Sequence, residues 1–169
     1  MADYFIADTH FGDNRIISLE NRKFKDVVTH DKQLVKNWND TVTQDDTVYV
    51  LGDFTTYKNE YGVRNLINSL NGNKVLVMGN HDDIFTTDTW KNLGFNLVIP
   101  YPIIYKNFFI LSHEPMYVNE NGAYANIYGH VHGNPNYKDY SNLGACVCVE
   151  RIGYTPISFE KLVQNMRES

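Results

Sequence analysis

Val75-Leu76-Val77 and the Met78-Gly79-Asn80-His81-Asp82 that follows it are the stretch around which the chain is organised. The apolar run predicts a buried strand, and Gly79 ends that strand so that three polar side chains gather at its exit. Asn80 is expected to adopt the left-handed backbone conformation that such an exit often requires. Ligands of α/β proteins bind beyond the carboxyl ends of strands, so this exit is a candidate ligand site.

Four other predicted strands end in polar groups of the same kind. They are followed by Asp8 and His10, by Asp53, by His113, and by His130 and His132. Neutral imidazoles and carboxylates are the ligands of Zn²⁺, Mn²⁺ and Fe, and the absence of thiolates argues against a zinc-finger type of site. Seven or eight such donors are too many for one four-coordinate ion. They suit two ions that share a bridging carboxylate.

The first half of the chain predicts alternating strands and helices. Apolar residues at three- and four-residue spacing predict helices over 30–42, with Thr29 as the N-cap, and over 63–70. A short helix is expected over 15–20. Strands at 4–7, 47–51 and 74–77 complete a β-α-β-α-β order, which favours parallel pairing with helices on the sheet faces.

The pattern changes after residue 95. Short apolar runs separated by turns predict strands within 95–99, 102–105, 108–111, 127–128 and 145–149, and Ser158 is expected to cap a final helix. These strands suggest a second, more antiparallel sheet packed against the first. With no repeat, linker or low-complexity tract, residues 1–169 are expected to form a single α/β domain.

Composition limits the classes of function. The net charge of −5 disfavours loose binding to nucleic acid, which needs a basic surface. No run approaches the ~18 apolar residues that span a membrane, and the N-terminus carries no secretory signal. Cys146 and Cys148 are expected to be reduced thiols in a core strand. A cytoplasmic location is therefore expected, with no membrane partner.

The motifs, taken together, resemble those of the calcineurin-like metallophosphoesterases, and most closely the small bacterial and phage members. The resemblance rests on the following segments in this order: Asp8-Thr9-His10, Gly52-Asp53, Gly79-Asn80-His81-Asp82, His113 and Gly129-His130-Val131-His132. It implies a four-layer sandwich of two mixed β-sheets flanked by helices. It agrees with the strand and helix order expected from the residues.

The same resemblance implies a role for each motif residue. One ion would be held by Asp8, His10, Asp53 and His132, and a second by Asp53, Asn80, His113 and His130. His81 would contact the substrate phosphate and protonate the leaving oxygen, with Asp82 orienting its ring. The expected cofactors are two divalent ions, with Mn²⁺ favoured and Fe, Ni²⁺ or Zn²⁺ compatible with the donors.

The expected function is hydrolysis of a small, nucleotide-like phosphodiester or phosphomonoester by attack of a metal-bridging hydroxide. Asn14 and Arg22 are candidate substrate contacts, although Arg22 also fits a solvated charged face. His30 is expected to be structural or exposed. The alternatives are a nuclease of the same superfamily, with nucleic acid a disfavoured substrate, and a non-catalytic scaffold with the same fold. The sequence leaves the oligomeric state, the native metals and the natural substrate open.

Overall fold

The computed structural model describes residues 1–169, and its ten strands form two five-stranded sheets. The first sheet has the order β10-β1-β2-β3-β4. Its strands are β1 (Asp3–Ile6), β2 (Thr47–Val50), β3 (Asn73–Val77), β4 (Leu97–Ile99) and β10 (Ile157–Ser158). β1 to β4 are parallel and β10 pairs antiparallel with β1, so this sheet is mixed.

The second sheet has the order β5-β6-β7-β9-β8. Its strands are β5 (Ile103–Tyr105), β6 (Phe109–Leu111), β7 (Ala125–Tyr128), β8 (Tyr140–Ser141) and β9 (Gly144–Cys146). The three central strands β6, β7 and β9 are parallel, and only the outer pairs are antiparallel. The sheet is therefore less antiparallel than expected, because long loops rather than hairpins connect its central strands.

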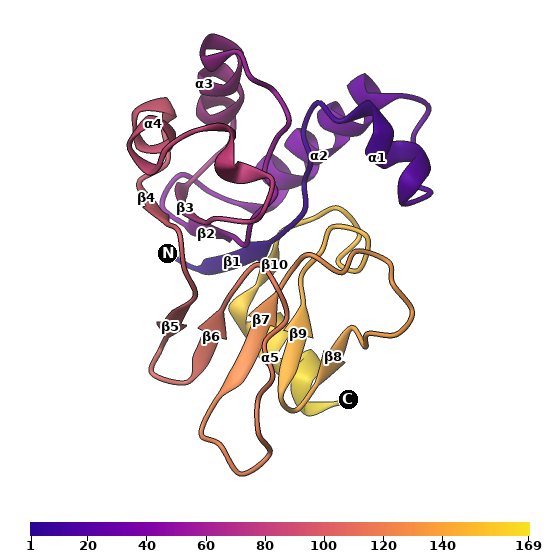
Figure 1. Cartoon of the computed structure of the whole chain (residues 1–169), viewed down its shortest axis with the longest axis vertical. Helices are drawn as coiled ribbons and strands as arrows, with labels where there is room; N and C mark the ends of the chain where they lie inside the picture. The colour runs from indigo at the N-terminus through magenta and orange to yellow at the C-terminus, as the bar shows by residue number, and fades with distance from the viewer.

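Helices α1 (Asn14–Leu19), α2 (Val27–Thr41), α3 (Glu60–Ser69) and α4 (Thr87–Leu93) lie on the side of the first sheet away from the second (Figure 1). The apolar faces of α2, α3 and α4 share one core with that sheet. The core includes Ile6, Val48, Val50 and Leu76 of the strands with Leu34, Trp38, Val63, Ile67, Trp90 and Leu93 of the helices. A short 3-10 helix, Asp82–Ile84, follows the β3 exit.

A second core fills the space between the sheets. It joins Phe5, Leu51 and Val77 to Leu111, Ile127 and Ala145, and helix α5 (Phe159–Arg167) adds Leu162 and Met166. Ser158 caps α5 by accepting a hydrogen bond from the Lys161 N–H, as predicted. The fold class is thus confirmed as two mixed β-sheets flanked by helices.

Further details of the sequence-based interpretation were also wrong. The segment expected to open the second sheet contains β4, which instead pairs in parallel with β3 in the first sheet. The unpredicted helix α4 makes this crossover, and it buries Trp90 and Leu93 completely. The N-cap of α2 is Asp26, which accepts a hydrogen bond from the Thr29 N–H, because the helix starts three residues earlier than expected.

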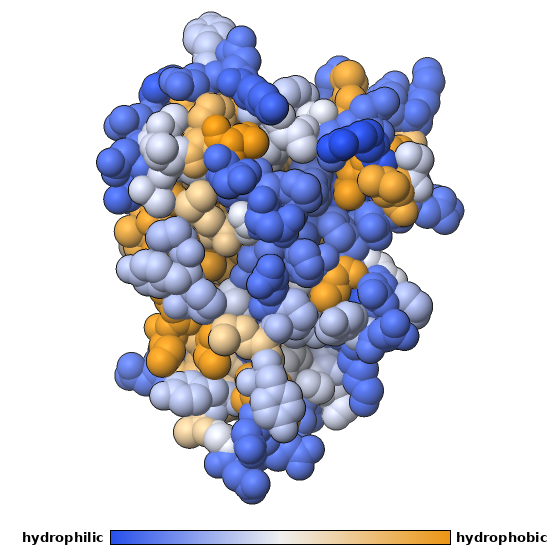
Figure 2. Space-filling model, in the orientation of Figure 1, coloured by the Kyte–Doolittle hydropathy of each residue, from blue (hydrophilic) through white to orange (hydrophobic).

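The surface separates polar from apolar regions. Figure 2 shows hydrophilic side chains across the middle of the molecule, and apolar side chains along the edge formed by β4 and β5. Leu97 and Ile104 are among the exposed apolar residues of that edge. None of the helices has the length and hydropathy needed to cross a lipid bilayer.

Candidate metal centre

The exits of five strands converge between the two sheets. The donors come from three strands of the first sheet and two of the second: Asp8 and His10 follow β1, Asp53 follows β2, Asn80 and His81 follow β3, His113 follows β6, and His130 and His132 follow β7. The structure therefore brings together all seven residues predicted to bind metal. Asp8, His10, Asp53 and His113 form the buried side, while Asn80 and His130 are exposed.

Backbone strain marks the same exits. Asp8, His10, Asp53, His130 and His132 all have positive φ, between 46° and 69°. Non-glycine residues adopt this region at a cost, and such residues cluster at functional sites. Asn80, which was expected to be left-handed, is not among them. The strain lies instead where the chain must leave a strand and turn a carboxylate or imidazole inward.

The first group of donors surrounds Asp8. Its Oδ1 lies 3.6 Å from His132 Nε2, and its Oδ2 accepts a hydrogen bond from the His130 N–H. Donor atoms of Asp8, His10 and His132 all lie within 4.8 Å of one another. Asp8 Oδ1 and His10 Nε2 are buried without a hydrogen-bond partner. Buried polar atoms are rarely left unpaired, so these two atoms are candidate metal donors.

The second group surrounds Asn80. Its Oδ1 lies 3.0 Å from His113 Nε2 and 3.1 Å from His130 Nδ1. The two ring nitrogens are themselves 3.1 Å apart. Two atoms bound ~2.1 Å from one ion lie about 3.0–3.4 Å apart, so these separations suit a shared ion.

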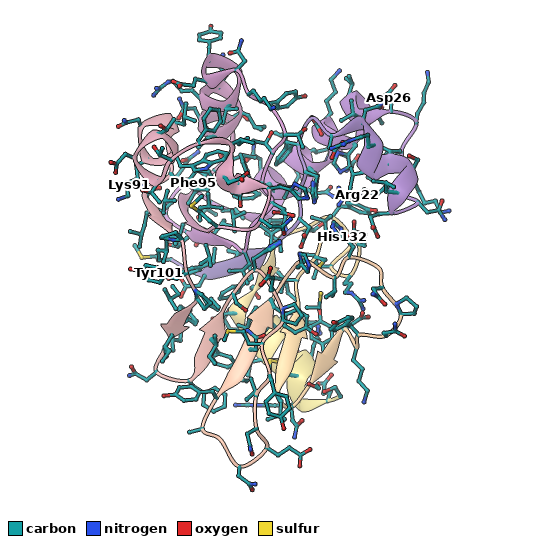
Figure 3. The ribbon with its side chains drawn as sticks, in the orientation of Figure 1. Arg22, Asp26, Lys91, Phe95, Tyr101 and His132 are labelled. Atoms are coloured by element: carbon teal, nitrogen blue, oxygen red, sulfur yellow. The ribbon has the colours of Figure 1, made fainter.

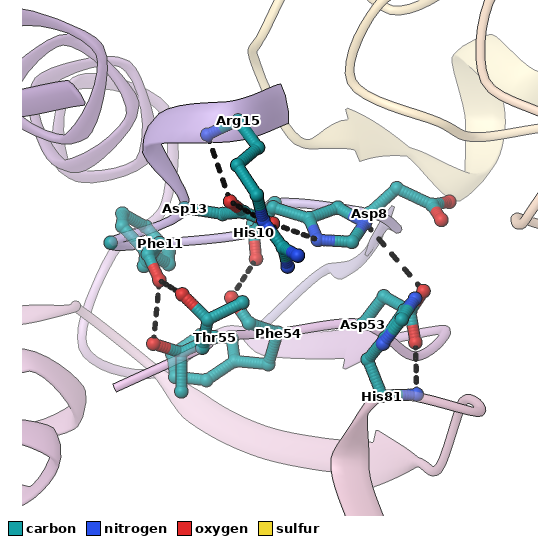
Figure 4. Close-up of polar contacts among 12 residues, drawn as sticks. Asp8, His10, Phe11, Asp13, Arg15, Asp53, Phe54, Thr55 and His81 are labelled. Atoms are coloured by element: carbon teal, nitrogen blue, oxygen red, sulfur yellow. Dashed lines mark hydrogen bonds and ion pairs between the residues drawn. The ribbon is translucent and has the colours of Figure 1, made fainter. Parts of the chain in front are cut away.

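Asp53 joins the two groups. Its Oδ2 lies 3.6 Å from His10 Nε2 and 3.5 Å from His113 Nε2, one imidazole from each group. Its other oxygen, Oδ1, accepts the His81 N–H at 2.9 Å. Figure 4 shows the contacts of Asp53 with His10 and His81. A single carboxylate oxygen is thus placed between the two groups of candidate metal donors.

Hydrogen bonds assign the tautomers of two imidazoles. His113 Nδ1 lies 2.8 Å from the Leu51 carbonyl oxygen, and His132 Nδ1 lies 3.1 Å from Glu150 Oε1. Both partners can only accept, so each Nδ1 carries the proton. Each Nε2 is then the ring nitrogen left to coordinate an ion.

The pKa values of His10 and His132 are shifted in opposite directions. Burial, followed by the charges of His132 and Arg22, lowers the pKa of His10 to about 3, which keeps this imidazole neutral. Burial also acts to lower the pKa of His132, but the Glu150 hydrogen bond and the charges of Asp8 and Glu150 raise it to about 9. Ion binding at neutral pH would therefore displace a proton from His132.

Glu150 is a site residue that the sequence did not reveal. It lies beyond β9, near His132, and donor atoms of Glu20, His132 and Glu150 fall within 4.8 Å of one another. Arg22 Nη2 is only 2.6 Å from Glu150 Oε1, so the carboxylate is already neutralised by a cation. Glu150 Oε1 thus contacts both His132 and Arg22, while Oε2 is buried without a hydrogen-bond partner.

The Arg22 side chain is not accessible to a substrate. Its side chain is fully buried rather than on a solvated face. Its guanidinium donates to Glu150 and to the carbonyl oxygens of Asp8 and Thr9. Because its N–H groups are bonded to these acceptors, Arg22 stabilises Glu150 and the backbone at the β1 exit and is not free to bind a substrate. His30 is buried beside it, with Nε2 2.8 Å from Arg22 Nη1.

Asp82 also has a different role from the one expected. Its carboxylate accepts the N–H groups of Asp53, Gly79 and Phe54, and it makes no hydrogen bond to the His81 ring. It fixes the backbone of the β2 and β3 exits instead. His81 itself is exposed, with its ring centroid 5.6 Å from that of His10, and Asn14 is exposed at the start of α1.

The Asp82 contacts predict a loss of stability rather than a specific loss of proton transfer. Asp82→Asn should lower the free energy of unfolding by ~1–3 kcal/mol, because an amide NH₂ would face a buried N–H that now has an acceptor. Urea denaturation of the metal-free protein measures this change. Unchanged stability together with a large fall in kcat would instead favour an orienting role for Asp82 at His81.

Comparisons with known proteins agree with this geometry. The family model described as calcineurin-like phosphoesterase matches residues 4–139. An uncharacterised protein of Methanocaldococcus jannaschii is 35% identical over 174 residues, which cover 95% of this chain and 89% of that protein. The Gene 66 protein of Mycobacterium phage L5 is 37% identical over 81 residues, covering 47% of this chain and 39% of the phage protein.

A solved structure extends the likeness to the fold. The crystal structure of a protein of unknown function from Aquifex aeolicus superposes with a TM-score of 0.71 and 28% identity, covering 98% of this chain and 99% of that one. The family match and the strand-exit donors point the same way. The chain belongs to the calcineurin-like phosphoesterase family and resembles its small phage and bacterial members.

Proposed function

We propose that this protein is a two-metal phosphoesterase that hydrolyses a small, nucleotide-like phosphodiester or phosphomonoester. The observation that carries the proposal is the position of Asp53 Oδ2, 3.6 Å from His10 Nε2 and 3.5 Å from His113 Nε2. One oxygen so placed suits a bridge between two ions. Asp8, His10 and His132 would complete one ion's donors, and Asn80, His113 and His130 the other's.

Two divalent ions, when bound, would make a water molecule acidic enough to give hydroxide near neutral pH and would neutralise charge on the phosphoryl oxygens. The donors are all carboxylate or amide oxygens and imidazole nitrogens, a set compatible with Mn²⁺, and also with Fe, Ni²⁺ or Zn²⁺. We propose Mn²⁺ as the first ion to test.

His81 is the residue best placed to act on the leaving group. It is exposed beside the donors, and its backbone N–H is anchored to Asp53 Oδ1. The ring lies at the open side of the site, with its centroid 5.6 Å from that of His10 and outside both donor groups. An imidazole can donate a proton to a leaving oxygen near neutral pH.

The surroundings of the site support a small substrate. A hollow of about 530 Å³ lies beside His130 and His132, and it is lined in part by Glu20 and the turn at Gly133 to Pro135. This volume falls in the range of small-molecule sites. Exposed Asn14, at the start of α1, remains a candidate contact for such a substrate.

Paired chromogenic esters test this proposal. Metal-stripped protein should not hydrolyse bis-p-nitrophenyl phosphate or p-nitrophenyl phosphate, and Mn²⁺ should restore hydrolysis. The preferred ester would distinguish diester from monoester specificity. No turnover of either ester with any divalent ion, despite bound ions, would contradict the proposal.

His81→Ala tests whether His81 acts as the general acid. It should lower kcat by ~10²–10⁴-fold, the usual contribution of a positioned general acid. Mn²⁺ binding should be unchanged, since the ring lies outside both donor groups. Mn²⁺ content measured beside kcat separates these effects, and loss of bound Mn²⁺ would assign His81 to the metal centre instead.

A further inference from the structure

We propose that Glu150 and Arg22 form a positioning pair for only one of the two ion sites, the one formed by Asp8, His10 and His132. The inference rests on the proposed two-ion function and assigns a role to residues that do not touch either ion. It follows from the contacts that Glu150 and Arg22 make with His132 and with the β1 exit.

Glu150 holds the ring of His132. A carboxylate accepts only, so the 3.1 Å contact between His132 Nδ1 and Glu150 Oε1 is an Nδ1–H donating to that oxygen. The bond fixes the rotation of the ring and turns Nε2 toward Asp8 Oδ1, 3.6 Å away. Carboxylates that hold metal-binding imidazoles in this way strengthen metal binding.

Arg22 ties this carboxylate to the β1 exit. Its Nε and Nη2 lie 2.8 Å and 2.6 Å from Glu150 Oε1. The same guanidinium donates to the carbonyl oxygens of Asp8, at 2.8 Å, and Thr9, at 3.1 Å. Figure 3 shows Arg22 and His132 on neighbouring segments of this side of the molecule. One rigid side chain therefore sets the distance between the Asp8 backbone and the support of His132.

A second chain of hydrogen bonds fixes Arg22 itself. A guanidinium only donates, so His30 Nε2 is the acceptor at 2.8 Å and His30 Nδ1–H donates to Asp31 Oδ1 at 2.9 Å. Asp31 Oδ2 accepts the Gly12 N–H and the Tyr57 hydroxyl, both at 3.0 Å. The His30 and Arg22 side chains are both fully buried, whereas Tyr57, at the far end of the network, is exposed.

The other donor group lacks such a pair. His113 Nδ1–H donates to a backbone carbonyl, that of Leu51, rather than to a carboxylate. Neither Glu150 nor Arg22 makes a hydrogen bond with Asn80, His113 or His130. Loss of Glu150 should therefore weaken one ion site and spare the other.

A Zn²⁺ titration followed by the ¹⁵N signals of the histidine rings tests this selectivity. In the wild-type protein, all four ligand imidazoles should respond as two Zn²⁺ ions bind. In Glu150→Gln, His10 and His132 should require ~10–100-fold more Zn²⁺, the usual effect of losing such an outer partner. His113 and His130 should respond as in the wild type.

Glu20→Gln is the matched control. It removes one negative charge near His132, but Glu20 makes no hydrogen bond to that ring. It should leave the titration of all four imidazoles within about twofold of the wild type. An equal effect of Glu20→Gln and Glu150→Gln would overturn the proposal in favour of general electrostatic attraction.

A charge-neutral double variant keeps the test valid if Glu150→Gln unfolds because Arg22 is left buried and unpaired. Arg22→Met with Glu150→Met removes both charges, and it should show the same selective weakening at His10 and His132. Wild-type affinity at both sites, or equal weakening of both, in a folded variant would overturn the proposal. A wild-type protein that binds fewer than two Zn²⁺ would instead contradict the two-ion function, independently of Glu150.

Discussion

Asp53→Asn should abolish metal-dependent turnover, with kcat/KM falling by at least about 10³-fold, while the protein remains folded. An ion is worth several kcal/mol of stabilisation to the transition state, and each ~1.4 kcal/mol is tenfold in rate. Asp53 Oδ2 faces His10 Nε2 and His113 Nε2, so losing its charge weakens both donor groups at once. Hydrolysis of bis-p-nitrophenyl phosphate over a range of Mn²⁺ concentrations measures the loss.

The fold should tolerate this change better than catalysis does. The Asn oxygen can still accept the His81 N–H in place of Asp53 Oδ1. Its NH₂ would then face His10 Nε2, a buried atom that lacks a partner in the metal-free protein. The melting temperature of metal-free Asp53→Asn should therefore be equal to or above that of the wild type.

Asp88→Asn, at an exposed position in the first turn of α4, is the control for the substitution itself. It should leave turnover and Mn²⁺ binding unchanged. Wild-type turnover in Asp53→Asn would contradict the bridging role, and a large fall in its melting temperature would show that Asp53 acts on the fold instead.

The donor residues could be predicted because the sequence pattern that identifies each of them is local. Each follows an apolar run directly, as Asp53 follows β2 and His113 follows β6. Parallel strands bring their carboxyl ends to one edge, so a polar exit identifies a site residue before any contact is known. The periodicity of the helices placed α3 and α5 for the same reason: both the pattern and the structure are local.

The supporting residues could not be predicted in this way. Glu150 is separated from Arg22 by 128 residues, and neither stands in a recognisable motif. Asp82 adjoins the motif histidine, yet its acceptor oxygens turn toward the backbone of Asp53 and Phe54. Side chains that act through burial and long-range hydrogen bonds leave no periodic signal. The position of an acidic or basic residue beside a motif therefore predicts that the residue lies near the site, but it does not predict which contacts the side chain makes there.

Gly52→Ala should destabilise the protein by about 2–5 kcal/mol and remove His113 from the metal centre. Gly52 has φ of +84°, where an L-residue costs ~1–2 kcal/mol. A Cβ there would lie 2.3 Å from His113 Nδ1 and 2.7 Å from the Gly79 Cα, and such overpacking adds about 1–3 kcal/mol. Urea denaturation and Mn²⁺ binding measure the two effects.

Gly153→Ala separates strain from steric overlap, because Gly153 has φ of +63° and no atom within 4 Å of an added Cβ. This control should lose only the ~1–2 kcal/mol of backbone strain and keep full Mn²⁺ binding. In Gly52→Ala the added Cβ cannot move toward the Gly79 backbone, which is also too close. The His113 imidazole must therefore move away, and this breaks its hydrogen bond to Leu51 O. Equal losses in the two variants would show that His113 can move aside without cost. A larger loss in Gly52→Ala, with weakened Mn²⁺ binding, would show that the missing side chain at Gly52 is what allows β2 and β6 to deliver their donors to one centre.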